Sequence, residues 1–227
     1  NRSGSLADVS CFSFHAVKNL TTSEGGAVCF NLPNDFNHEE IYKDFVTITL
    51  HGQSKDALAK TKKGAWKYDV VTPGYKCNMT DIQAAMGLVE LDRYQENLDR
   101  RKAIFSAYDH AFGDKPWAIM PAHIDKDKTS SHHLYLLRIK DISEPQRDLI
   151  IQNIFDKEVS VNVHFQPLPL LTAYKNLGYN IDHYPVAYHK YQTEISLPVY
   201  FNLNDEQVAQ VIDAVISSVE MVLDLKR

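Results

Sequence analysis

The sequence contains little of what marks several specialised classes of protein. Its 227 residues include only three cysteines, Cys11, Cys29 and Cys77, whose number and wide spacing fit neither a disulfide framework nor a zinc site. We expect three reduced, mostly buried thiols. No apolar run approaches the roughly 20 residues that a membrane span needs, and no signal peptide is visible. The sequence therefore predicts a cytoplasmic protein without a membrane partner.

An excess of one charge is also absent. The formal net charge is −5, from 24 basic and 29 acidic residues that form no long run of one sign. Nucleic-acid-binding surfaces usually concentrate basic residues, so this balance argues against a nucleic-acid partner. Apolar residues make up 44% of the chain, which is enough for a globular protein with a hydrophobic core.

Hydrophobic periodicity and capping signals predict a chain of mixed strands and helices, of the α/β class. Strands are expected at residues 6–14, 27–30, 134–139, 159–164 and 195–198. Helices are expected to start after Asn37, Thr80, Ser143 and Asn204, each a capping residue before a helical pattern. The pattern after Thr80 continues, with or without a bend, to a stop at Gly113. Residues 53–68 are polar and predict a surface loop.

The first segment that could carry chemistry runs from Ser13 to Gly26. A predicted strand ends there in a polar loop that offers a hydroxyl group, an amine and a pair of glycines. Ser13 can donate a hydrogen bond to a phosphate oxygen, and a desolvated Lys18 can lose its proton and attack an aldehyde. From composition alone, the commoner alternative for Lys18 is a solvated surface lysine.

The residues Ser-Phe-His-Ala-x-Lys-Asn, followed by Glu-Gly-Gly, resemble the cofactor-lysine motif of the DegT/DnrJ/EryC1/StrS family. These are sugar aminotransferases of fold type I that depend on pyridoxal 5′-phosphate. The resemblance implies that Lys18 holds this cofactor and that Ser13 binds its phosphate. It also implies that residues 1–98 are the C-terminal portion of the large cofactor-binding domain and that residues 99–227 are a small C-terminal α/β domain.

A second block, Gly-Tyr-Lys-Cys-Asn-Met-Thr-Asp-Ile-Gln-Ala-Ala at residues 74–85, resembles a family segment that reaches into the neighbouring subunit's site. The resemblance implies a homodimer in which Lys76 or Asn78 contacts the partner's cofactor phosphate. The family usually has asparagine where this chain has Lys76. The alternative for these two residues is a solvated lysine and a turn asparagine. The Gly-Tyr-Lys-x-Asn version resembles the branch that aminates UDP-4-keto sugars.

Downstream, Val-His-Phe-Gln-Pro at residues 163–167 resembles a family segment near the sugar nucleotide. The resemblance implies that His164 binds substrate; the alternative is a strand-end histidine satisfied by the backbone. Ser-Leu-Pro at residues 196–198 matches the family's C-terminal signature, in a structural role. His132 and His133 are adjacent and would point to opposite faces of a strand, so they chelate poorly and no metal is expected.

Together, the resemblance implies transamination of a nucleotide-linked keto sugar, specifically a UDP-4-keto sugar, with glutamate as donor and 2-oxoglutarate as its product. The resemblance also implies a role in surface polysaccharide or lipopolysaccharide biosynthesis. One alternative is a dehydratase of the same family, although such relatives carry histidine in place of Lys18. Another is a non-catalytic regulatory or interaction member. The family's phosphate-binding turn, stacking aromatic residue and pyridinium-pairing aspartate lie upstream of this segment, and Asp8 is not assigned that last role. We therefore expect this chain to be a fragment and to be inactive by itself.

Overall fold

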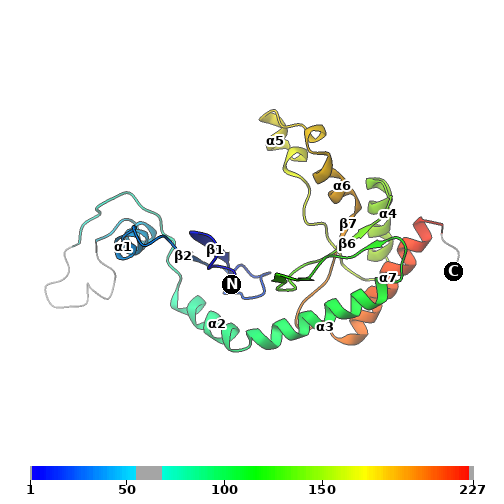
Figure 1. Ribbon diagram of the computed structural model, residues 1–227, viewed down its shortest axis with the longest axis horizontal. Helices are drawn as coiled ribbons and strands as arrows, with labels where there is room; N and C mark the ends of the chain where they lie inside the picture. Colours follow the sequence, from blue (N-terminus) through cyan, green and yellow to red (C-terminus); the bar gives the residue numbers. More distant parts are fainter. Residues whose placement is uncertain (1, 55–67, 225–227) are drawn as a thin grey trace. The chain divides into compact units, whose positions relative to one another are not determined.

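The computed structural model describes residues 2–54 and 68–224. The polar loop predicted at residues 53–68 therefore falls almost wholly outside the described part of the chain. The chain divides into two compact units, Asn1–Arg93 and Tyr94–Arg227. Each unit has its own arrangement of strands and helices (Figure 1). The domain division expected between residues 98 and 99 stays a prediction.

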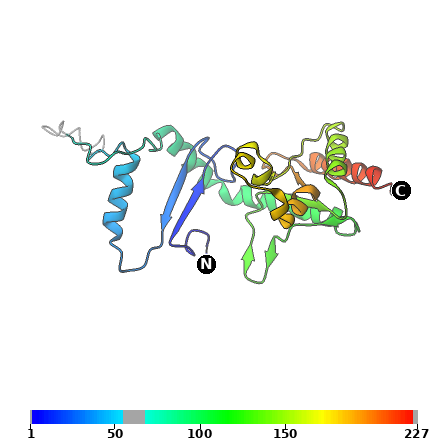
Figure 2. The same cartoon turned by 90° about the horizontal axis from the view of Figure 1, so that it is seen from above.

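The first unit contains a two-stranded antiparallel ribbon of β1 (Val9–Ser13) and β2 (Gly26–Phe30). The register places Val9 opposite Phe30 and Ser13 opposite Gly26, and Figure 2 shows the two strands lying side by side. β1 is shorter than the predicted strand at residues 6–14 because the chain turns before it, with the Ser5 N–H donating to the Arg2 carbonyl. The ribbon clamps both ends of the segment that carries Lys18.

Two helices follow the ribbon within the described part of this unit. α1 (His38–Thr49) starts after Asn37, whose side chain accepts a hydrogen bond of 3.2 Å from the Glu40 N–H. α2 (Asp81–Asp92) starts after the predicted cap Thr80, which forms both hydrogen bonds of a capping box with Gln83. Both helix starts are thus where the capping residues predicted them.

The apolar side chains of the first unit are largely exposed. On α2, the apolar stripe of Ile82, Met86 and Val89, which recur at helical spacing, is 77%, 42% and 60% exposed. The three cysteines are exposed as well, so the prediction of mostly buried thiols was wrong. The physical reason is that the described residues of this unit place no second layer over the ribbon. Side chains that would face a core in a layered domain therefore stay at the surface.

The second unit begins with α3 (Tyr94–Phe112), so the long helical pattern is two helices separated at Arg93. α3 ends at the predicted stop, Gly113, whose N–H donates to the Asp109 carbonyl at 2.9 Å. Next come β3 (Ala118–Ile119), a small hairpin of β4 (Ile124–Asp125) and β5 (Lys128–Thr129), and β6 (Tyr135–Ile139).

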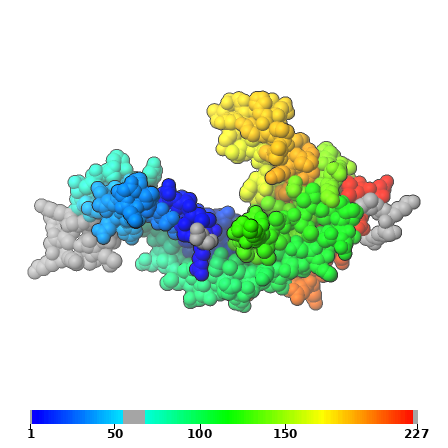
Figure 3. Space-filling model, viewed as in Figure 1, coloured from blue at the N-terminus to red at the C-terminus, as the bar shows by residue number. Residues whose placement is uncertain are grey.

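The rest of the second unit is mostly helical. α4 (Glu144–Phe155) starts after Ser143 with a full capping box. The short helices η2 (Leu168–Leu170), α5 (Thr172–Asn176) and η3 (Ile181–His183) lead to α6 (Pro185–Thr193). Figure 3 shows the short helices, in yellow, standing out from the rest of the unit. β7 (Glu194–Leu197) and α7 (Asp205–Val222), which starts after the predicted cap Asn204, complete the chain.

One antiparallel sheet, in the order β3-β6-β7, organises this unit. Along β6, Tyr135, Leu137 and Ile139 are fully buried, whereas Leu136 and Arg138 are only half-buried. Successive strand residues point to opposite faces, so one face of β6 supplies the core and the other is partly open. α3, α4 and α7 supply many of the other core side chains, among them Ile104, Phe105, Tyr108, Ile150, Ile154, Val211, Val215 and Val219.

The strand predicted at residues 159–164 was wrong. This segment forms only a single bridge, between Asn162 and Ser196 of β7. Side chains take the hydrogen bonds that a longer ladder would need: the Val163 N–H donates to the Asn162 amide oxygen, and the His164 N–H donates to the Glu194 carboxylate. The segment therefore turns away from the sheet and places the His164 side chain beside β7.

Candidate functional site

The lysine-bearing loop of the first unit is closed by its own backbone. The Phe14 N–H donates to the Gly25 carbonyl at 2.8 Å, and the Thr22 N–H donates to the Phe14 carbonyl at 2.9 Å. Within this closed loop the Lys18 N–H donates to the His15 carbonyl at 2.9 Å, and the Lys18 side chain is half-buried. Hydrogen bonds thus fix the backbone of the loop on both sides of Lys18 and at Lys18 itself.

Ser13 lies at the end of β1, at the entrance to the same loop. Its hydroxyl oxygen accepts a long contact of 3.4 Å from the His15 N–H, and the residue is exposed. Because the oxygen acts there as an acceptor, the hydroxyl proton can be donated to an anion. The predicted pair of hydroxyl and amine is therefore placed on one short loop.

Helix α2 supports this loop from the side. Thr22 is only 2% exposed, and a Cβ atom at Gly87 of α2 would come within 2.9 Å of the Thr22 methyl group. The Thr22 hydroxyl also donates to the Glu24 carbonyl at 2.9 Å. The absent side chain at Gly87 lets the helix approach the loop this closely.

Lys76 and Asn78 lie in the segment between the two helices of the first unit. The Lys76 ammonium donates a hydrogen bond to the Asn78 amide oxygen, and both residues are exposed. The backbone here is fixed by the Leu50–Lys76 bridge and by the Cys77 N–H, which donates to the Thr49 carbonyl at 2.9 Å. Contact of Lys76 or Asn78 with a partner subunit's cofactor stays a prediction.

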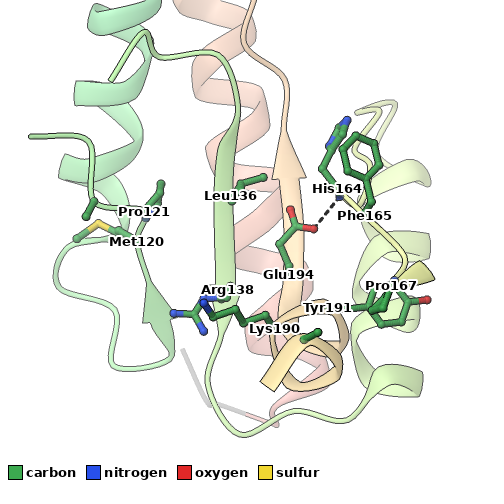
Figure 4. Close-up of a pocket in the computed structure, with 12 residues that line it drawn as sticks. Met120, Pro121, Leu136, Arg138, His164, Phe165, Pro167, Lys190, Tyr191 and Glu194 are labelled. Carbon is green, nitrogen blue, oxygen red and sulfur yellow. Dashed lines mark hydrogen bonds between the residues drawn. The ribbon is translucent and has the colours of Figure 1, made fainter. Parts of the chain in front are cut away.

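The second unit holds a separate pocket of about 570 Å³, in which His164 takes part (Figure 4). Leu136 and Arg138 line it from the partly open face of β6, and Phe165 lines it with a ring that is 75% exposed. Lys190 and Tyr191 reach it from α6. The pocket combines apolar walls with several charged groups, which is typical of small-molecule sites.

A chain of side-chain hydrogen bonds connects His164 to β7. His164 Nδ1 lies 2.7 Å from the Ser196 hydroxyl oxygen, and that hydroxyl donates to Glu194 Oε1. Since the hydroxyl has one proton and gives it to the carboxylate, Nδ1 must be the donor to the oxygen. The arrangement fixes the tautomer of a neutral His164 with its proton on Nδ1. His164 is therefore more than a strand-end histidine satisfied by the backbone.

Glu194 is the buried acid at the end of this chain, only 5% exposed. Burial raises the pKa of the Glu194 carboxyl group, while hydrogen bonds from the Ser196 hydroxyl and the His164 N–H oppose that rise. Both carboxylate oxygens thus have donors within the protein. The charge of Glu194 is directed towards His164.

Helix α6 forms a fixed wall of the pocket because α4 holds it. The Tyr188 and Tyr191 hydroxyls donate to the two carboxylate oxygens of Glu144, at 2.8 and 2.9 Å. Arg147, 2% exposed, donates to the Tyr191 carbonyl at 2.6 Å and lies 4.6 Å from the centre of the Tyr191 ring. Lys190, between the two tyrosines, is therefore presented from an anchored helix.

Sequence reasoning found His164 in this pocket but missed the residues around it. Arg138 and Glu194 meet as direct cross-strand partners in the β6–β7 register, which no local pattern reveals. His132, for which no metal was expected, is buried with its ring 4.9 Å from that of Phe105, and burial lowers its pKa. Within residues 2–54 and 68–224 no group of three or more metal-binding side chains is found. The helices of that part of the chain are also too short or too polar to cross a membrane.

Residues 1–216 match a sequence model of the DegT/DnrJ/EryC1/StrS aminotransferase family. The spore coat polysaccharide biosynthesis protein SpsC of Bacillus subtilis is 36% identical over 216 residues, which cover 93% of this chain and 54% of SpsC. The UDP-4-amino-4,6-dideoxy-N-acetyl-beta-L-altrosamine transaminase of Campylobacter jejuni is 31% identical over 219 residues, 96% of this chain and 54% of that enzyme.

Among solved structures, the putative sugar aminotransferase Spr1654 from Streptococcus pneumoniae, in its PMP form, superposes with a TM-score of 0.91 at 49% identity. The match covers 97% of this chain and 55% of Spr1654. The PLP form of the same protein gives a TM-score of 0.90 at 46% identity. The chain thus spans about half the length of the relatives it matches.

Proposed function

Because this chain belongs to the DegT/DnrJ/EryC1/StrS aminotransferase family, we propose that the whole protein transfers an amino group to the keto carbon of a nucleotide-linked sugar. The expected family, the fold class and pyridoxal phosphate as the family's cofactor are confirmed by the match and by relatives in PLP and PMP forms. The observation that carries the proposal is the closed loop that carries Lys18 and has Ser13 at its entrance.

The residues of this loop fit the cofactor. Ser13 has a hydroxyl proton to donate to a phosphate oxygen, and Lys18 provides an amine on a half-buried loop. Pyridoxal phosphate, when bound, supplies the electron sink for removal of a proton from the donor. Lys18 Nζ would hold the cofactor and, as a free amine, would accept that proton and return it at the neighbouring carbon. Transamination needs both roles from one amine, and the proposal assigns both to Lys18.

The substrate proposal is a UDP-linked 4-keto sugar with glutamate as donor. Its supports are the Gly74-Tyr75-Lys76-Cys77-Asn78 segment and the Campylobacter relative, whose name is that of a transaminase for a UDP-4-amino sugar. A role in surface polysaccharide formation is in keeping with the name of SpsC. We further propose a homodimer in which Lys76 or Asn78 acts at the neighbouring site.

The test uses the full-length protein. Lys18→Ala and Lys18→Arg should both abolish turnover and the absorbance of lysine-bound cofactor, because a guanidinium group keeps its proton in proteins. Lys43→Arg, an exposed lysine of α1 in the same unit, is the matched control and should behave as wild type. Near-wild-type transamination by either Lys18 variant would refute the assignment.

The substrate claim is tested separately, with UDP- and dTDP-linked 3-keto and 4-keto sugars and glutamate as donor. We expect the highest kcat/KM for a UDP-linked 4-keto sugar. A clear preference for a 3-keto sugar would overturn the position of amination and leave the aminotransferase proposal in place.

A further inference from the structure

The pocket of the second unit contains positively charged side chains that its own carboxylate does not pair with. Arg138 of β6 and Lys190 of α6 both line it, and Figure 4 shows both side chains at the end away from His164. Within the described part of the chain, neither the Arg138 guanidinium group nor the Lys190 ammonium group has a recorded hydrogen bond or ion pair. Two cations in one pocket repel each other, and an anion bound between them would offset that repulsion.

Glu194 does not fill this role, although it is the cross-strand neighbour of Arg138. Its carboxylate accepts from the Ser196 hydroxyl and from the His164 N–H, and Figure 4 shows it directed towards His164. The pocket therefore has two ends: a buried carboxylate with its donors at one, and two cations at the other.

The walls between these ends suit a ligand with a flat or apolar body. Met120, Pro121 and Leu136 line one part of the pocket, and Phe165 presents an exposed ring. A planar group can stack on such a ring while its charged group reaches the cations. The guanidinium group of Arg138 offers parallel N–H donors that match two oxygens of one carboxylate or phosphate.

We propose that this pocket binds an organic anion, with Arg138 and Lys190 pairing with its carboxylate or phosphate oxygens. The inference deepens the proposed function, on which the choice of probes rests. A carboxylate would come from the amino donor or its keto-acid product, and a phosphate would come from the nucleotide of the sugar substrate. Arg138 makes the directional contact, and Lys190 adds a point charge.

The experiment is isothermal titration calorimetry on the full-length protein at low salt, with 2-oxoglutarate and UDP as separate probes. Arg138→Gln should weaken binding of at least one probe by about fivefold to tenfold, the loss expected for a charge-assisted contact in a half-buried position. Lys190→Gln, at an exposed position, should weaken the same probe by about threefold. The effects should shrink at high salt, where charges are screened.

Lys140→Gln and Lys175→Gln are the matched controls, since both lysines are exposed, lie in the same unit and do not line the pocket. Both should bind as wild type does. If the pocket variants lose affinity for UDP alone, the subsite binds phosphate. If they lose affinity for 2-oxoglutarate alone, it binds carboxylate. Either result supports the proposal. If Arg138→Gln does not fold, Lys190→Gln carries the test.

The proposal is overturned if the pocket variants bind both probes like the controls, or if the wild-type protein binds neither. Transamination by the wild-type protein, measured in parallel, separates the two claims. An active wild type with unchanged variants rejects the subsite alone. An inactive wild type whose anion binding depends on Arg138 rejects the aminotransferase proposal alone.

Discussion

The hydroxyl group of Ser196 connects a buried acid to the histidine of the pocket, and its removal should reveal what that connection contributes. Ser196→Ala deletes two hydrogen bonds, one from His164 Nδ1 to the hydroxyl oxygen at 2.7 Å and one from the hydroxyl to Glu194 Oε1. Ser196 is only 4% exposed, so a water molecule does not readily take the place of its hydroxyl group. Both former partners are then left with an unmet hydrogen-bonding group.

The expected loss can be worked out from these contacts. A neutral hydrogen bond contributes about 1 kcal/mol net and one to a charged group about 1.5–3 kcal/mol. His164 is only half-buried, so its contact belongs at the lower end. We expect the free energy of unfolding of the second unit to fall by about 2–3 kcal/mol at pH 7.5, or a midpoint lower by roughly 5–10 °C.

The loss should depend on pH in one direction. The pKa of Glu194 already lies above its ordinary value of 4.5 because the carboxyl group is buried, and the Ser196 hydrogen bond holds that rise back. A carboxyl group whose pKa is raised on folding destabilises the folded state above that pKa, and the penalty disappears as the pH falls towards 4.5. Ser196→Ala raises the pKa further, so it should cost more at pH 7.5 than at pH 5.

Chemical denaturation followed by the fluorescence of Trp117 measures this. Trp117 is 4% exposed in the core of the second unit, and a Trp66→Phe background leaves it as the one tryptophan within residues 1–227. Ser106→Ala, an exposed serine of α3, is the control and should change stability by less than about 0.5 kcal/mol. A loss of equal size at both pH values would refute the role given to Glu194.

Two further predictions concern the whole assembly. Mixing Lys18→Ala subunits with Lys76→Glu subunits of the full-length protein should restore part of the activity, because one site of each heterodimer would contain both native lysines. The proposed action across the interface would be wrong under three conditions together: heterodimers form, Lys76→Glu alone is impaired, and mixing restores no activity. Residues 1–227 alone should bind pyridoxal phosphate weakly and catalyse no transamination, since they span 54% of the relative SpsC and leave the apolar stripe of α2 exposed. Titration of the isolated chain, followed by absorbance and a donor half-reaction, checks this, and tight binding with turnover would contradict it.

Local signals predicted the helix starts well, because the information lies within four residues. Thr80 and Ser143 both make the reciprocal side-chain bonds of a capping box with the residue three positions on. Such bonds form in any context that leaves the helix end accessible, so sequence alone is sufficient. The same holds for the end of α3 at Gly113, because glycine is favoured directly after the last residue of a helix.

What sequence could not predict depends on partners distant in the chain. Residues 159–164 have strand-like composition, yet the Asn162 and Glu194 side chains capture the N–H groups that a strand would use. The cysteines are apolar enough to be buried, but burial requires a covering layer that the first unit does not supply among its described residues. Arg138 reaches the pocket through the register of two strands, a property of the pair and of neither strand alone.

The close approach of Gly87 to Thr22 has a consequence for sequence evolution and for protein engineering. The two segments are far apart in the sequence, yet a Cβ atom at position 87 would come within 2.9 Å of a side chain that is itself locked in place. The side chains that one segment can accept therefore depend on the other segment. In a chimaera of two relatives, the lysine loop and α2 should be exchanged together. A chimaera that transplants the loop without its helix would displace Thr22, and with it the Phe14 carbonyl that closes the loop around Lys18.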